Sequence, residues 1–203
     1  DINHSPYSFD DEDYDIKVVD DPNEVMDRIK VLNEIYNKAR VLAGYCWDWI
    51  SKEDGNGYDI TIEKYNFHHQ WNLSRTNTWA IDEDSVDQIG CIHTSQGLEF
   101  SYCGVIIGPD LRYENGRVIT DYTKRAGTDK SLYGLIGNCR RGDELALKKV
   151  DAIIRNTYKT LLSRAMKGCF VFCTDIALSK HLKDEIERNK ALMAAFKKES
   201  RLV

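Results

Sequence analysis

One continuous apolar run, Tyr102–Gly108, constrains the fold of this chain more than any other segment. Its Val and Ile residues follow one another without the polar alternation of a strand that has one face in water. A strand that is apolar on both faces is typical of a parallel sheet with helices on either side. The run therefore predicts an α/β fold with a largely parallel sheet.

The rest of the chain supplies the other elements that such a fold needs. Asp20-Asp21-Pro22 marks a helix start, and Glu114-Asn115-Gly116 predicts a hairpin turn within 111–120. The segment 64–86 is expected to be irregular, and 121–142 to be a long polar and basic loop. Periodicity predicts further strands over 15–19, 40–45, 58–63, 88–93 and 168–173, and helices over 22–38, 143–166 and 176–198.

Acidic residues are concentrated at the amino-terminal end of the chain. The 203 residues include 28 basic and 33 acidic side chains, and residues 1–15 hold six of the acids and no Lys or Arg. The remainder holds 28 basic and 27 acidic side chains, a net charge of +1. We expect residues 1–15 to be an acidic lead-in and residues 16–203 to form one domain, which is not strongly basic.

The composition indicates neither a membrane protein nor an oxidising compartment. No apolar run approaches the length of a membrane span, so no membrane partner is expected. The six cysteines form no CxxC pair and lie mostly in apolar runs, a usage that suits a reducing cytosol and predicts a cytoplasmic protein. No metal site is expected, and neither GxxxxGK[ST] nor GxGxxG is present.

The segment Gly90–Phe100, GCIHTSQGLEF, places polar residues at the end of an expected strand. An imidazole, two hydroxyls and exposed backbone amides at such a place can contact phosphates. Gly97 allows close backbone approach to a ligand, and Glu99 can accept a hydrogen bond from a ribose hydroxyl. Taken alone, an ordinary strand–turn–helix corner with polar residues explains the segment better.

The segment Arg155–Gly168, RNTYKTLLSRAMKG, ends an expected helix just before a buried strand. An arginine at the rim of a sheet can offer planar, bidentate N–H donors to a phosphate. Taken alone, a helix end that carries Arg164 and Lys167 to suit the helix dipole is the better explanation.

The order and spacing of the two segments resemble motifs V and VI of superfamily 1 helicases. The first, about residues 88–100, is similar to T-[VI]-H-x-[SA]-[KQ]-G-x-E-F, with Gln96 as an accepted form. The second, about residues 155–167, is similar to [VL]-x-[TS]-R-A-x-x-x-L. Over roughly residues 15–182 the chain resembles the DUF2075 family of Schlafen group 3-like DNA/RNA helicases, through RVLAGYCW at 40–47, WAID at 79–82 and VIIGPDLRY at 105–113.

The resemblance implies a fold and a place in a larger protein. In that superfamily, two RecA-like domains clamp ATP between them, and this chain resembles the second one, a three-layer α/β/α domain without its own phosphate loop. ATP and Mg²⁺ would be bound mainly by the first RecA-like domain of the same polypeptide. This fragment alone is therefore expected to hold neither of them tightly and to be inactive.

The resemblance also implies roles for individual residues. Arg164 would be the arginine finger on the γ-phosphate, the catalytic residue of this domain. Contacts to the nucleotide would come from Gln96, Gly97 and Glu99. Contacts to nucleic acid, single-stranded DNA or RNA, would come from His93, Thr94 and Ser95.

Two features depart from the helicase pattern. No clear arginine of motif IV precedes residue 40, so it is expected upstream of Asp1, since Arg40 opens a buried strand. Lys159 stands where a tyrosine often precedes the finger by five residues, and Tyr158 is adjacent. Arg155 is expected to support motif VI by pairing with an acid.

Further candidate contacts to nucleic acid have competing explanations. Aromatic rings can stack on bases, or they can pack in the core or at a domain interface, and this applies to Trp47, Trp49, Trp71 and Trp79. The basic residues of 121–142 have two explanations that fit equally well, a path for nucleic acid and a solvated loop. These residues are Lys124, Arg125, Lys130, Arg140 and Arg141.

The leading hypothesis is the carboxy-terminal motor domain of an ATP-dependent DNA/RNA helicase. The alternative is an NTP-dependent switch, or a defence or regulatory ATPase module, that does not unwind a duplex. A stand-alone α/β binding domain is the third hypothesis, and it requires the gene to begin near Asp1.

Overall fold

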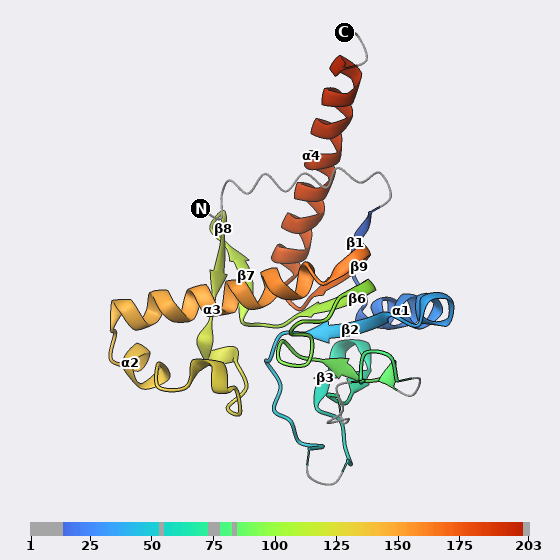
Figure 1. The fold of residues 1–203 in the computed structure, drawn as a ribbon. Helices are drawn as coiled ribbons and strands as arrows, with labels where there is room; N and C mark the ends of the chain where they lie inside the picture. Colours follow the sequence, from blue (N-terminus) through green and yellow to red (C-terminus); the bar gives the residue numbers. More distant parts are fainter. Residues whose placement is uncertain (1–13, 53–54, 73–77, 83–84, 201–203) are drawn as a thin grey trace.

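A parallel sheet forms the centre of the molecule (Figure 1). The computed structural model describes residues 14–52, 55–72, 78–82 and 85–200. In this part of the chain the main sheet has the strand order β1-β9-β6-β2-β5, and every neighbouring pair is parallel. Its strands are β1 (Asp15–Val19), β2 (Ala39–Ala43), β5 (Ile89–Gly90), β6 (Phe100–Ile107) and β9 (Ala165–Cys173). The apolar run that predicted a parallel sheet is the central strand β6, which confirms the α/β fold.

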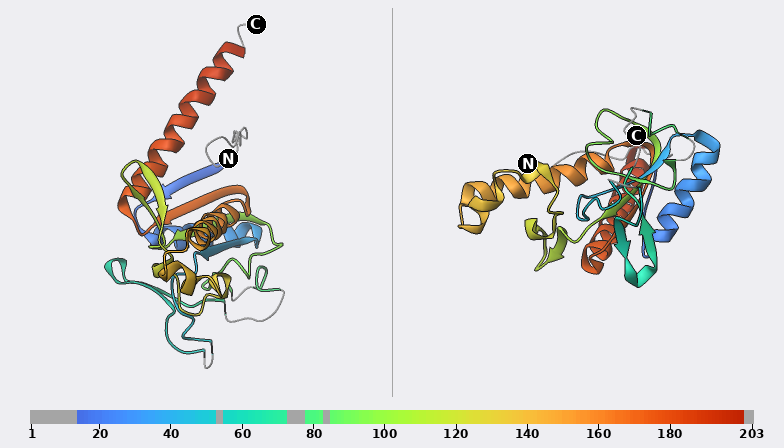
Figure 2. Two further views of the ribbon diagram at one scale, coloured as in Figure 1. Left: turned by 90° about the vertical axis from the view of Figure 1, so that its left-hand side faces the viewer. Right: turned by 90° about the horizontal axis from the view of Figure 1, so that it is seen from below.

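Helices cover both faces of this sheet, as the views in Figures 1 and 2 show. α1 (Pro22–Tyr36) packs Val25 and Ile29 into one apolar cluster, which also contains Ile106 of β6. α3 (Glu144–Leu162) packs into a second cluster with Val105 and Ile107, the neighbours of Ile106 that point to the opposite face. The two clusters on opposite faces give the three-layer α/β/α architecture that the sequence predicted.

Side-chain caps explain where the two covering helices begin. The carboxylate of Asp21 accepts a hydrogen bond from the backbone N–H of Asn23 at 2.8 Å, and Pro22 occupies the first turn of α1. α1 ends at Asn37, whose left-handed backbone has a φ of 46°. The carboxylate of Asp143 caps α3 by accepting hydrogen bonds from two backbone N–H groups of its first turn.

Smaller elements extend from the sheet. β7 (Leu111–Glu114) and β8 (Arg117–Thr120) form the predicted hairpin. Asn115 and Gly116 both have positive φ, as a type I′ turn requires. A second hairpin joins β3 (Ile60–Ile62) to β4 (Phe67–His69). α4 (Ile176–Ser200) follows β9 and projects away from the sheet (Figure 1).

The helix expected over 143–166 ends at Leu162, because Ala165 and Met166 already belong to β9. Three other segments differ more from the sequence-based expectations. Only Ile89–Gly90 of the expected strand 88–93 pairs in the sheet, because the chain turns at Cys91, whose carbonyl accepts a hydrogen bond from the backbone N–H of Ser95 at 3.0 Å. The segment 64–86 was expected to be irregular, but it contains the strand β4 and most of the short helix η1 (Glu63–Tyr65). The segment 121–142 is not one loop, because Asp121 and Asp129 cap short helices in it. These helices are η3 (Tyr122–Lys124), η4 (Lys130–Leu132) and α2 (Ile136–Arg140).

Residues 1–13 of the expected acidic lead-in lie outside the part of the chain that the structure describes. Where the structure describes the chain, no helix is both long and apolar enough to cross a membrane.

Candidate nucleotide and nucleic-acid site

The two motif-like segments meet at the amino ends of β6 and β9. Phe100 of β6 is paired with Ala165 of β9, and the backbone N–H of Phe100 donates a hydrogen bond to the carbonyl of Arg164 at 2.9 Å. Arg164 itself stands between the end of α3 and the start of β9. The pairing of these two strands therefore brings together residues that lie 64 positions apart in the chain.

Arg164 is half-buried and makes few hydrogen bonds. One terminal nitrogen of its guanidinium donates to the carbonyl of Leu98 at 3.4 Å, and its buried Nε has no hydrogen-bond partner among the described residues. A buried donor without a partner costs free energy unless a ligand, water or ion pairs with it. The guanidinium is thus held beside the first segment with donor capacity to spare.

Gly97 and Glu99 lie beside this arginine on the exposed side of the same segment. Gly97 has a φ of 78°, a left-handed conformation that strains a residue with a Cβ atom, and open space surrounds the position where that atom would lie. Glu99 is exposed and directly precedes β6. The structure therefore brings Gly97, Glu99 and Arg164 to one edge of the sheet.

Other residues of the first segment line a pocket of about 580 Å³. His93 and Gln96 are exposed there, and Thr94 is anchored by donating its hydroxyl hydrogen to the Asn72 Oδ1 at 2.7 Å. Gln96 thus lies with His93 and Thr94 in the pocket wall. Ser95, in contrast, is fully buried and donates its hydroxyl hydrogen to the carbonyl of Ile92 at 3.2 Å, so it holds the turn.

The other walls of the pocket come from the segments that follow β2, β4 and β5 and from the residues at the start of η4. They contribute aromatic rings, polar groups and two lysines. These residues are Tyr45, Trp49, Lys52, Asn72, Trp79, Cys91, Thr128, Asp129 and Lys130, and Leu98 closes the lining.

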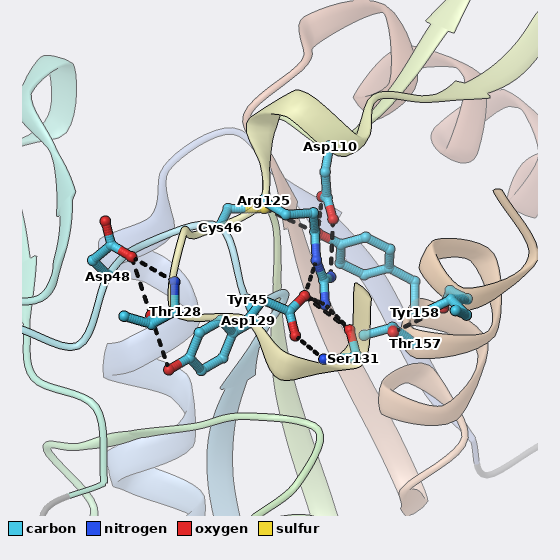
Figure 3. A network of polar contacts seen from close by, with 11 residues as sticks. Tyr45, Cys46, Asp48, Asp110, Arg125, Thr128, Asp129, Ser131, Thr157 and Tyr158 are labelled. Carbon is cyan, nitrogen blue, oxygen red and sulfur yellow. Dashed lines mark hydrogen bonds and ion pairs between the residues drawn. The ribbon is translucent and has the colours of Figure 1, made fainter. Parts of the chain in front are cut away.

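A buried polar network lies at the carboxyl end of β6 (Figure 3). At its centre Arg125, only 1% exposed, donates to Asp129 Oδ2 at 2.7 Å and to Asp110 Oδ2 at 3.1 Å. Burial opposes the charge on this guanidinium, but Asp129 and Asp110 outweigh that effect and raise the pKa of Arg125. Ser131 also accepts from Arg125, so the expected path for nucleic acid does not include Arg125.

Tyr158 ties this network to α3. Its hydroxyl donates to Asp110 and accepts a hydrogen bond from the backbone N–H of Gly108 at 2.9 Å. A Cβ atom at Gly44 would lie 1.9 Å from that hydroxyl oxygen, so the ring fits only because residue 44 is a glycine. Burial, with the nearby Cys46 and Asp110, raises the pKa of Tyr158 well above its ordinary value.

The four tryptophans divide between core and pocket. Trp71 is fully buried, stacks on Tyr45 with ring centroids 5.2 Å apart, and donates to the carbonyl of Trp47. Trp47 is partly buried and donates to the carbonyl of Thr61 at 3.2 Å. Only Trp49 and Trp79 line the pocket. Core packing therefore accounts for Trp71, and only Trp49 and Trp79 are placed where a ring could contact a base.

Two further arginines have structural partners. Arg40 is fully buried in β2 and donates to Ser85 Oγ at 2.9 Å and to the carbonyl of Asp82 at 2.8 Å, as expected of a residue in a buried strand. Arg155 pairs with an acid, Asp151, but it also donates to the carbonyl of Val118 at 2.7 Å. The expected pairing of Arg155 with an acid is present, and the same side chain also ties β8 to α3 through Val118.

The network was not predicted, although one of its residues was named in another role. The sequence predicts Arg125 in a nucleic-acid path or a solvated loop, and it singles out Asp110 only within the string at 105–113 and Tyr158 only as the neighbour of Lys159. An aspartate just beyond the apolar run Tyr102–Gly108 is the one local signal that could have pointed to it. Among the described residues, no group of three or more His, Cys, Asp or Glu side chains could hold a metal ion.

The parallel sheet, the helices on both faces and the meeting of the two segments define a RecA-like α/β/α domain. The family described as Schlafen group 3, DNA/RNA helicase domain, matches residues 1–175, and the chain belongs to this family. The description of the family places this domain among DNA/RNA helicase domains.

One curated relative is an uncharacterized protein of Saccharomyces cerevisiae, YPL245W, which is 26% identical over 172 residues. The match covers 83% of this chain but only 36% of the yeast protein. No solved structure matches the chain.

Proposed function

We propose that this chain is the second, carboxy-terminal RecA-like motor domain of a superfamily 1 DNA/RNA helicase, with Arg164 as its arginine finger. The observation that carries the proposal is the position of Arg164 at the amino end of β9. There it lies beside Leu98 and keeps a buried Nε without a partner in the described chain. A guanidinium held in place by one carbonyl can direct its other donors to a phosphate.

ATP would bind between this edge and the first RecA-like domain of the same polypeptide. That domain would supply the phosphate loop and the acidic residues that hold Mg²⁺, whose charge stabilises the phosphates. Within this chain, Arg164 would stabilise charge that develops on the γ-phosphoryl group during hydrolysis. Gly97 would let the backbone approach the nucleotide, and Glu99 would accept a hydrogen bond from its ribose.

Nucleic acid would bind on the other side of the same short segment. His93 and Thr94 lie in the pocket, only a few residues before Gly97 and Glu99 in the chain. One segment would therefore contact both nucleic acid and nucleotide, so that a shift of the segment at one site displaces it at the other. Gln96 would act at the pocket together with His93, and Ser95 would support the turn rather than contact a ligand.

Arg164→Ala in the full-length protein tests the proposal. We expect ATP turnover to fall by about 10³- to 10⁵-fold, the range seen when an arginine finger is lost, with ATP binding largely kept. Arg188→Ala is the matched control, because Arg188 is an exposed arginine of α4 that pairs with Glu185 and should leave turnover unchanged. Turnover at the wild-type rate in Arg164→Ala would refute the finger role.

A strand-displacement assay separates unwinding from the alternative of an ATP-dependent switch. A helicase couples ATP turnover to the separation of a duplex, and its turnover rises when single-stranded nucleic acid is added. Turnover without stimulation or strand separation would favour the switch or regulatory module.

A further inference from the structure

The pocket described above has the size and lining of a binding site. Its volume, about 580 Å³, falls within the range of roughly 300–1,000 Å³ that is common for ligand pockets. The walls combine the surfaces of aromatic rings with polar side chains. A ligand with a flat aromatic part and polar edges would match this lining.

Trp49 is the aromatic group best placed to bind such a ligand. Its ring is only partly buried, whereas Trp79 and Tyr45, which also line the pocket, are buried. The buried indole nitrogens of Trp49 and Trp79 have no hydrogen-bond partner in the described part of the chain. These two N–H groups are buried and unpaired within the described chain, whereas the N–H groups of Arg125 bond Asp110 and Asp129.

The charges around the pocket favour an anion next to the aromatic part. The ammonium group of Lys52 lies 5.4 Å from the ring centroid of Trp49, and the exposed Lys130 also lines the pocket. Asp129, the carboxylate of the lining, is 2% exposed and already paired with Arg125. Among the described lining residues, a phosphate beside a base that stacks on Trp49 would therefore meet the cations Lys52 and Lys130, while the carboxylate of Asp129 is already paired.

We propose that this pocket binds one unstacked base of a nucleic-acid single strand, with Trp49 as the stacking surface and Lys52 and Lys130 on the flanking phosphates. The inference rests on the proposed function, because it assumes that the domain binds nucleic acid. A base within a duplex is stacked on its neighbours and cannot enter, so the pocket selects single strands. His93 and Gln96 carry hydrogen-bonding groups that can meet the edge of the base.

The test is a base-removal scan with the full-length protein. Single-stranded DNA and RNA oligonucleotides of matched sequence are compared with versions in which one position at a time lacks its base but keeps its phosphate. Removal at one position should weaken binding to the wild-type protein about tenfold, the loss typical of one stacked base. Comparison of the DNA series with the RNA series shows whether the protein prefers a deoxyribose or a ribose strand.

Trp49→Ala should weaken binding of the intact strand by a similar factor and should be insensitive to base removal at that position. Trp49→Phe should restore most of the affinity and the sensitivity, because it retains an aromatic face. Lys52→Ala should weaken every strand, with or without the base, whereas the matched control Lys64→Ala should not. Lys64 also lies over an aromatic ring, that of Tyr65, but away from the pocket.

The results separate this inference from the proposed function. If the wild-type protein binds single strands and Arg164→Ala abolishes turnover, but no position responds to base removal, only the base pocket is wrong. An equal response of Trp49→Ala and wild type at the sensitive position also overturns the pocket. If the wild-type protein binds no single strand, the nucleic-acid part of the proposed function fails first.

Discussion

Arg125 and Arg164 lie at opposite edges of the same sheet and differ in how their donors are used. Arg125, beyond the carboxyl end of β6, is almost fully buried and donates to two carboxylates and a hydroxyl. Arg164, at the amino end of β9, donates to one carbonyl at 3.4 Å and has a buried Nε without a partner in the described chain. Both are single arginines next to a central strand, but only one is fully paired.

The difference separates an arginine that builds the fold from one that is available to a ligand. Each N–H of Arg125 that pairs with Asp110 or Asp129 offsets part of the cost of burying three charges. Arg164 has no carboxylate within ion-pair distance among the described residues, so a phosphate would find its charge unneutralised. Removing the first arginine should therefore damage stability, and removing the second should damage activity.

The largest effect on stability is expected from Arg125→Met. This change leaves Asp110 and Asp129 buried without their cation and should lower the free energy of unfolding by about 3–5 kcal/mol. Arg164→Met, the matched substitution, should change it by less than about 1 kcal/mol. Urea unfolding followed by circular dichroism measures both values.

Equal losses in the two variants would contradict the comparison. In that case Arg164 would also stabilise the fold. A loss of ATP turnover in Arg164→Ala could then result from unfolding and would not show a role in ATP hydrolysis. A stable Arg125→Met variant would show instead that the network tolerates the loss of its cation.

A smaller loss is expected from Tyr158→Phe. The hydroxyl bonds Asp110 and the Gly108 backbone N–H, so its removal leaves a buried donor and a buried acceptor short of a partner. We expect a decrease of about 1–3 kcal/mol in the free energy of unfolding. Tyr133→Phe is the control, because Tyr133 is 90% exposed and should be neutral. A neutral Tyr158→Phe variant would show that water replaces the hydroxyl.

Much of the fold could be predicted because its signals are local. The apolar run of β6, the Asp21 cap with Pro22, and the Asn115-Gly116 turn each specify an element within a few residues. β5 is shorter than predicted because the turn that begins at Cys91 withdraws the chain from the sheet. That turn competes with strand pairing through contacts that periodicity does not record.

The candidate site was only partly predictable, for a physical reason. Arg164 could be singled out because it belongs to a short string with a recognisable pattern, and strand pairing then places it beside Leu98. The burial of Arg125 could not be predicted, because its partner Asp110 lies 15 positions away in the chain. A sequence does not distinguish a buried arginine from a solvated one. The pocket combines residues from several segments, and no single segment indicates it.

The smallest effect concerns Arg155, an arginine with an intermediate degree of pairing. It donates to Asp151 at 2.9 Å, and Asp151 also accepts from Thr120 at 2.8 Å. Partial burial raises the pKa of Asp151, but the hydrogen bonds from Arg155 and Thr120 outweigh it and bring this pKa below its ordinary value of 3.8. The carboxylate form is therefore favoured in the folded state.

The sign of this shift predicts a pH dependence. Because the pKa is lower in the folded state, the stabilisation is present above the unfolded pKa and is lost as the pH falls through the folded one. Asp151→Asn should cost less than about 1 kcal/mol at pH 7, since the pair is partly exposed, and the difference from wild type should shrink as the pH falls below 3.8 and through the lower pKa of the folded state. Urea unfolding between neutral and acidic pH measures it, with Asp184→Asn on α4 as the control. If wild type and Asp151→Asn still differ in stability in acid, Asp151 acts through packing and not through its charge. Charge pairing would then explain the role of the buried Arg125 but not that of the partly exposed Arg155.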